Sequence, residues 1–198
     1  LPHKPWQLLL IGIFGLLVSG VLLAAVVALV LVPTLPSVHS LAANPLKVPL
    51  RVYSAEGTLM GEFGDEKRIP VTTAEVPKLL VKAIMAAEDH SFYYHQGVDF
   101  FGIARAAWSN FRSGRTGEGA STITMQVARN YFLSPEKTYT RKLKEILLAF
   151  KIERDLSKEQ ILELYLNKIF LGNRAYGFAA AAQIYYGKTL PELTLAEM

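Results

Sequence analysis

The sequence predicts a mainly α fold: a helical domain with a small β-hairpin, preceded by one transmembrane helix. Three observations predict it. Residues 8–32 form one apolar stretch without a charge, residues 50–63 hold a pair of short strand-like segments, and from residue 73 onward apolar residues recur at helical spacing. The chain has 198 residues, of which 51% are hydrophobic, enough for one domain of ordinary size and an appendage.

The apolar stretch at residues 8–32 is long enough to cross a bilayer. Its 25 residues carry no charge, and only Ser19 and three glycines interrupt its apolar character. At about 1.5 Å per residue, such a helix measures roughly 37 Å and spans about 30 Å of hydrocarbon with some tilt. The alternative is a cleavable signal peptide ending at the small-x-small site Ser40-Leu41-Ala42, but the apolar core of a signal peptide is normally only about 7–15 residues. We therefore expect a membrane anchor.

The segments flanking this anchor are expected to lie on opposite sides of the membrane. Residues 1–7 carry one charge, Lys4, and the default orientation places them in the cytoplasm and the bulk of the chain outside. Residues 33–49 contain four prolines, which predicts an extended linker. Residues 50–72 predict a hairpin region, whose two segments are the only strand pair that the sequence indicates.

Residues 73–198 predict a domain of six helices, and three of them have clear end signals. Asp99 is expected to cap the second helix, which stops near Gly114. A Ser-x-x-Gln capping box at 157–160 begins the fifth helix. The sixth helix is rich in alanine, follows a loop bracketed by glycines and ends at Gly187.

The other three helices are placed by spacing and by weaker caps. The first is expected to run from residue 73 directly into Glu88, and Ser121 is expected to cap the third. Ser134-Pro135 predicts the start of the fourth, with proline at its first position. A last capping box at 194–197 has no helix after it, which predicts that the domain is truncated at its C-terminal end.

The charge of the chain is uneven. Between residues 99 and 151 there are nine Lys or Arg against four Asp or Glu, an excess of five positive charges. This excess predicts an anionic partner, and a solvated basic surface is the alternative. The absence of cysteine is compatible with an exported protein that has no disulfides.

A first polar cluster, EDHSFYYHQG at residues 88–97, connects two predicted helices. Such a density of acids, histidines and aromatics is costly unless the polar groups have partners or a function. Glu88 at a helix C-terminus is disfavoured by the helix dipole by several tenths of a kcal/mol, so another group must hold it. Metal binding by His90 and His95 is an alternative, but their spacing is a poor ligand signal. His95 is better explained as a hydrogen-bonded residue that shapes the loop.

Two further clusters lie on predicted helices. GASTITMQVARN at 119–130 places small residues at a helix N-terminus, where free N–H groups can bind an anion, although capping by Ser121 alone also explains them. Gln126, Arg129 and Asn130 then share one polar face. On the fourth helix Arg141, Lys142 and Glu145 are spaced to touch, and a surface ion-pair cluster worth about 0.3–0.5 kcal/mol per pair is the alternative.

Taken together, these clusters resemble a known family. Four segments, EDHSFYYHQG, GASTITMQ, RKLKE and KEQILELYLN, are similar in order and spacing to motifs of glycosyltransferase family 51, and GFAAAAQIYYGK resembles part of the fifth. These are the peptidoglycan polymerases that occur alone or at the start of class A penicillin-binding proteins. The anchor, linker and hairpin are more similar to the class A proteins.

The chain departs from the family pattern at two points. Met125-Gln126 stands where the second motif usually has two glutamines, and the chain ends before the lysine that follows the fifth motif in the family. The three transpeptidase motifs Ser-x-x-Lys, Ser-x-Asn and Lys-Thr-Gly do not occur together, and Lys188-Thr189-Leu190 is not the third. We therefore expect no transpeptidase activity in this chain.

The resemblance implies a lysozyme-like domain that polymerises lipid II with inversion and releases undecaprenyl pyrophosphate. Glu88 would be the general base, and Glu145 would orient Lys142 or bind a divalent cation, Mg²⁺ or Mn²⁺. Lys142 and Arg129 would stabilise the pyrophosphate that leaves. The implied substrate contacts come from the polar residues of the motifs: Asp89, His95, Ser121, Thr122, Gln126, Arg129, Asn130, Arg141 and Lys142.

The expected partners are lipid II, the growing undecaprenyl-pyrophosphate glycan chain and the membrane, with cell-wall synthesis regulators or a second copy as further candidates and no nucleic acid. The expected location is the bacterial inner membrane, with the catalytic domain on its periplasmic side. Phe100, Phe101 and Trp108 could touch the bilayer, but their helical spacing favours the core. Two other functions stay open: a lysozyme-like hydrolase or lytic enzyme, and an inactive membrane-anchored scaffold.

Overall fold

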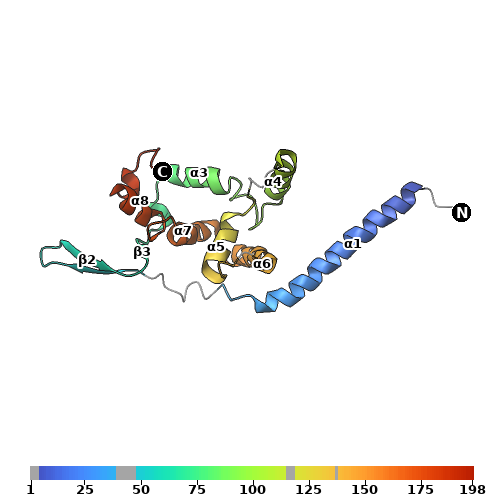
Figure 1. Cartoon of the computed structure of the whole chain (residues 1–198), viewed down its shortest axis with the longest axis horizontal. Coiled ribbons are helices and arrows are strands. Elements are labelled where there is room, and N and C mark those ends of the chain that lie inside the picture. Colours follow the sequence, from blue (N-terminus) through green and yellow to red (C-terminus); the bar gives the residue numbers. More distant parts are fainter. Residues whose placement is uncertain (1–4, 39–47, 115–118, 137) are drawn as a thin grey trace. The chain divides into compact units, whose positions relative to one another are not determined.

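A computed structural model describes residues 5–38, 48–114, 119–136 and 138–198. The chain divides into two units, Leu1–Pro36 and Ser37–Met198. The first unit contains helix α1, Pro5–Leu31, followed by a single 3₁₀ turn, Val32–Thr34 (Figure 1). The span Trp6–Thr34 is long and apolar enough to cross a membrane. This confirms the predicted apolar helix at residues 8–32 to within a few residues at either end.

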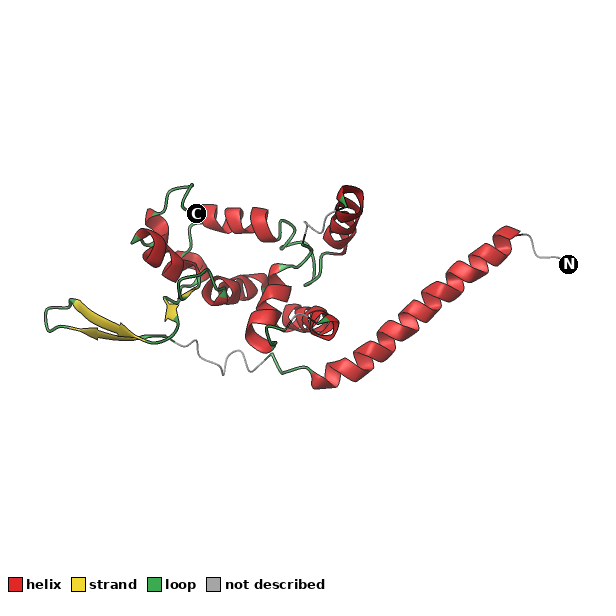
Figure 2. Cartoon of the chain, viewed as in Figure 1, coloured by secondary structure: helices red, strands yellow, loops and turns green. Residues whose placement is uncertain are grey.

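The second unit opens with the predicted hairpin. Strand β1, Leu50–Tyr53, pairs antiparallel with β2, Leu59–Phe63 (Figure 2). A second, parallel pair joins β3, Lys67–Arg68, to β4, Ala175–Tyr176, so the expectation of one strand pair was wrong. Two-residue strands are too short to show the alternation that identifies a strand in a sequence.

In the described part of the domain, six α-helices and two 3₁₀ turns follow. The α-helices are α3 (Lys78–Glu88), α4 (Phe100–Ser113), α5 (Ile123–Phe132), α6 (Tyr139–Asp155), α7 (Lys158–Lys168) and α8 (Phe178–Tyr186), and the 3₁₀ turns are Thr73–Glu75 and Leu190–Glu192. The Asp99 cap, the capping box that opens α7 and the left-handed Gly187 at the end of α8 are all as predicted.

Three predicted helix starts were wrong. Helix α3 begins after Pro77, because proline disfavours the helical conformation of the preceding Val76, which is extended. Thr122, not Ser121, caps α5 by accepting a hydrogen bond from Met125 N. Helix α6 begins at Tyr139 under a Thr138 cap, several residues after the predicted proline start.

Helix α5 lies between α6 and α7 and forms the centre of the core (Figure 1). All residues from Ile123 to Ala128 are buried, and the facing side chains of α6 and α7 are fully buried as well: Leu148, Ile152, Ile161, Leu162 and Leu166. Each such side chain contributes about 1.5–3 kcal/mol through removal from water. The central helix therefore provides a rigid support for polar residues at its two ends.

Helix α4 is packed differently from the prediction. Its buried residues are Gly102 and Ala106, whereas Phe101 is 92% exposed and Trp108 is 67% exposed. Phe100 is exposed in the same way, so the expectation that these aromatics belong to the core was wrong. Small residues on one side of α4 allow close packing, and the large aromatics face outward.

Candidate active site

Glu88 is the last residue of α3, and its side chain is exposed to solvent. The next residue, Asp89, is buried and points the other way. Both Asp89 oxygens lie 3.0 Å from His95 Nε2, and Oδ2 also accepts a hydrogen bond from Ile123 N at 3.0 Å. A carboxylate at the first turn of α5 is favoured by the helix dipole. Asp89 therefore fixes the end of α3 to the start of α5.

The Glu88 carboxylate is held by a residue of α5. Gln126 Nε2 donates to Glu88 Oε2 at 2.7 Å, and Gln126 is buried. This hydrogen bond offsets the unfavourable position of a carboxylate at a helix C-terminus. Tyr165 of α7 belongs to the same neighbourhood, because burial raises its pKa far above the usual value, the Glu88 charge adds to the rise and Arg129 opposes it.

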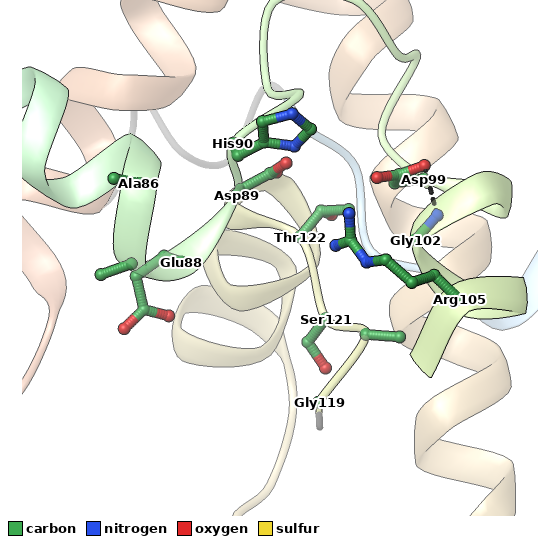
Figure 3. A pocket seen from close by; sticks show the side chains of 12 residues that line it. Ala86, Glu88, Asp89, His90, Asp99, Gly102, Arg105, Gly119, Ser121 and Thr122 are labelled. Atoms are coloured by element: carbon green, nitrogen blue, oxygen red, sulfur yellow. Dashed lines mark hydrogen bonds between the residues drawn. The ribbon is translucent and has the colours of Figure 1, made fainter. Parts of the chain in front are cut away.

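Glu88 lines a small pocket of about 130 Å³ between the end of α3, the start of α4 and the segment before α5 (Figure 3). In this view the Arg105 guanidinium reaches from α4 toward Thr122. The remaining polar lining comes from Asp89, His90, Asp99 and Ser121. The pocket places the proposed base beside the residues at the N-terminal end of α5.

A basic cluster on α6 reaches the same end of α5. Lys142 Nζ donates to Ser121 Oγ at 2.7 Å and to Glu145 Oε2 at 3.1 Å, and Arg141 pairs with the other Glu145 oxygen. Glu145 is 1% exposed, so its charge requires both cations. Arg141, Lys142 and Glu145 together carry a net charge of +1, and the Lys142 ammonium group points toward Ser121.

The structure therefore brings together most of the predicted site. Ser121, directly before the α5 cap, bonds to Lys142 on one side, and Gln126 of α5 bonds to Glu88 on the other. Arg129 and Asn130 lie half-buried in the last turns of the same helix.

Three predicted substrate contacts are instead bonded within the protein. Asp89 and His95 bond to each other, while the Thr122 hydroxyl donates to Gly97 O at 2.6 Å and accepts from Met125 N. These side chains fix the shape of the site, and their contact with a substrate stays a prediction. Sequence reasoning missed Arg105 and Tyr165, because nothing in their local spacing distinguishes a pocket residue from a helix surface or core residue.

A divalent cation does not fit at Glu145. Both of its oxygens are occupied by cationic side chains, and a further positive ion would be repelled. Within the described ranges, no group of three or more His, Cys, Asp or Glu side chains could hold a metal ion. No chemical step at this site is therefore assigned to a metal.

Comparison with known proteins decides the family. The family model described as Transglycosylase matches residues 56–198. The chain belongs to the transglycosylase family. The family predicted from the motifs is confirmed, as is the mainly helical fold with a small sheet and an N-terminal apolar helix.

Similar proteins of this transglycosylase family are much longer. The chain is 54% identical over 185 residues to penicillin-binding protein 1A of Neisseria meningitidis, covering 93% of this chain and 23% of the relative. It is 53% identical over 183 residues to penicillin-binding protein 1A of Pseudomonas aeruginosa, covering 92% and 22%. It is 55% identical over 166 residues to penicillin-binding protein 1A of Escherichia coli K12, covering 84% of this chain and 20% of the relative.

Among solved structures, a crystal structure of penicillin-binding protein 1A from Haemophilus influenzae aligns with 78% of this chain and 13% of that chain. The sequence identity is 32% and the TM-score is 0.35. The chain thus spans about a quarter or less of the length of each of these relatives.

Proposed function

We propose that this transglycosylase-family domain is a peptidoglycan glycosyltransferase that polymerises lipid II into glycan strands. One observation carries the proposal: α5 and the residue before its cap join an exposed carboxylate, Glu88 held by Gln126, to a cation, Lys142 held by Ser121. A base and an anion-binding group on one rigid support are what transfer of a sugar from a lipid pyrophosphate requires.

In the proposed reaction Glu88 accepts the proton of the 4-hydroxyl of a lipid-linked disaccharide. That oxygen forms a bond to the anomeric carbon of the growing chain from the face opposite to its pyrophosphate, so the configuration inverts. The bond between the anomeric carbon and the phosphate oxygen breaks, and the electron pair leaves with undecaprenyl pyrophosphate. Lys142 and Arg129 stabilise the growing negative charge, with hydrogen bonds from Ser121 and Asn130.

The charges around Glu88 support transfer over hydrolysis. Most glycosidases use a second carboxyl group that acts as acid, base or nucleophile. The other carboxylates of the pocket are engaged in structural bonds: Asp89 with His95 and Ile123, and Asp99 with Ser91 and the start of α4. The basic cluster on α6, by contrast, has a clear purpose if the leaving group is a pyrophosphate.

The apolar residues support a membrane substrate. Helix α1 would anchor the chain in the bacterial inner membrane, with the domain on its outer side. The exposed aromatics of α4, among them Phe101 and Phe111, would contact the bilayer surface and bring the site to its lipid substrate. Lipid II and the growing glycan chain are thus the proposed partners.

Incubation of the purified chain with labelled lipid II in detergent tests this proposal. The native chain should convert the label into glycan polymer, and Glu88→Gln should remove at least 99% of the rate, since a general base contributes roughly 10²–10⁴-fold. Glu56→Gln, in the exposed hairpin turn, is the control. Polymer formation by Glu88→Gln would contradict the assignment of the base. Release of sugars from preformed glycan by native enzyme and by Lys142→Ala alike would indicate a hydrolase.

A further inference from the structure

The loop that follows Glu88 is fixed at both ends. We call residues 89–97 the base loop, because it begins directly after the proposed base. At one end Asp89 is bonded to Ile123 N at the start of α5. At the other end Gly97 O accepts a hydrogen bond from Thr122, and an added Cβ at Gly97 would lie 2.9 Å from Ala149 O. The base loop is therefore pressed against α5 and α6.

Lys158, the first residue of α7, holds the middle of the base loop. Its Nζ donates to His95 O at 2.6 Å and lies 4.5 Å from the centre of the Phe92 ring. Phe92 is fully buried and the Lys158 side chain is 19% exposed. An ammonium group with so little access to water needs strong partners inside the protein, and a carbonyl oxygen and an aromatic face are two of them.

The third partner, Glu153, connects Lys158 to α5, the helix whose Gln126 bonds to Glu88. Lys158 Nζ donates to Glu153 Oε1 of α6 at 2.7 Å, and the same oxygen accepts the Thr124 hydroxyl of α5 at 2.6 Å. Thr124 is two residues before Gln126, which bonds to Glu88. Lys158 thus joins the base loop, α6 and α5 at one point. Without it, the Glu153 carboxylate, 8% exposed, would lose its cation.

We propose that Lys158 is a positioning residue for Glu88, which sets the orientation of the carboxylate by fixing the base loop to α7. The Lys158 ammonium group contacts three partners inside the protein. Lys158 is not among the described residues that line the Glu88 pocket. It acts on the reaction only through Glu88, so this inference rests on the proposed function.

Steady-state polymerisation by the whole chain with Lys158→Met tests the proposal. Methionine keeps most of the stem but removes the charge and the donors. We expect kcat to fall about tenfold with KM within about twofold, because a small displacement of the base slows chemistry without weakening substrate binding. Lys158→Arg should recover most of the rate. Lys78→Met, an exposed lysine at the first position of α3, should match the native chain.

The outcomes separate positioning from other roles. The proposal is overturned if kcat is unchanged in Lys158→Met, or if KM is raised while kcat stays constant. It is also overturned if the loss of rate is no larger than the fraction of unfolded protein that a thermal melt measures for this variant. If Lys158→Met does not fold, Glu153→Gln, which weakens the Lys158 contact and keeps its shape, is judged by the same criteria. Absence of polymer from the native chain rejects the proposed function itself, whereas native activity with an unaffected Lys158→Met rejects only the positioning role.

Discussion

Gln126 is the direct support of the proposed base, and it can be removed with little change in shape. Gln126→Met deletes the donor to Glu88 Oε2 and keeps the length of the side chain. We expect kcat for polymerisation to fall on the order of 10–100-fold with KM nearly unchanged, because the carboxylate is no longer held in one orientation. Gln183→Met, on the exposed side of α8, is the matched control. A raised KM with normal kcat would instead make Gln126 a substrate contact.

Asp99 ties the base loop to α4 through a carboxylate that also titrates. The Ser91 hydroxyl, and next the Gly102 N–H, hold the pKa of Asp99 below its usual value. A group with a lowered pKa in the folded state stabilises the fold fully above its unfolded pKa of about 3.9, and this stabilisation is lost as pH falls through the folded pKa.

Ser91→Ala should therefore raise the pKa of Asp99 toward its usual value and move the acid loss of stability to higher pH. Carboxyl chemical shifts followed between pH 2 and about 6 by nuclear magnetic resonance measure the pKa directly. Ser113→Ala, at the far end of α4, should leave the Asp99 titration where it is. An unshifted Asp99 pKa in Ser91→Ala would show that the hydroxyl is not its main partner.

At the scale of elements, the close approach of the base loop to α6 depends on one glycine. Gly97 has φ +87°, and a Cβ would lie 2.9 Å from both the carbonyl carbon and oxygen of Ala149. Gly97→Ala should destabilise the fold by more than about 2 kcal/mol, combining left-handed strain of about 1–2 kcal/mol with a backbone clash. Gly187→Ala, with φ +65° and open space, shows the strain alone. Chemical denaturation measures both, and equal losses would contradict the predicted clash.

Element ends could be predicted where one residue dominates the local choice. Asp99 has no rival as the cap of α4, and Gly114 and Gly187 adopt the left-handed conformation that glycine favours. Where two hydroxyl residues stand together, as Ser121 and Thr122 do, propensity does not choose between them. The structure assigns Thr122 to the cap and leaves Ser121 to Lys142, a partner 21 residues away.

The outward face of α4 could not be predicted for a similar reason. Periodicity identifies an apolar stripe, but it does not say whether protein or lipid covers that stripe. Gly102 and Ala106 indicate which side of α4 packs on the protein, because small residues permit close approach.

Within the site, contacts inside one helix could be predicted and contacts between helices could not. The contacts of Glu145 with Arg141 and Lys142 follow from spacing within one helix. The Glu88 bond to Gln126 joins two helices, so its prediction required either the family resemblance or the structure.

At the scale of the whole domain, one buried helix organises the site. The residues that bind Glu88 and Lys142 are Gln126 of α5 and Ser121, directly before the α5 cap, while the base and the basic cluster come from α3 and α6. Tyr165 approaches from α7. The sequence separates these groups, and the packing of α6 and α7 on α5 brings them together. Substitutions that loosen this packing should therefore disturb base and cation together.

The exposed aromatics of α4 give a further test at this scale, since the reaction is proposed to occur at a membrane. Phe101 and Phe111 are 92% and 82% exposed, so replacing both by serine should change the free energy of unfolding by less than about 1 kcal/mol. Polymerisation in lipid vesicles should nevertheless fall several-fold, while the rate in detergent stays near native, because only a bilayer offers a surface for α4.

The hairpin supplies the control for that experiment. Met60 is 72% exposed and lies on β2, so Met60→Ser removes a comparable apolar group away from α4. It should leave the ratio of vesicle to detergent rates unchanged. An equal loss of rate in vesicles and detergent for the α4 variant would place Phe101 and Phe111 in the folding or chemistry of the domain. An unchanged ratio would show that α1 alone brings the site to its lipid substrate.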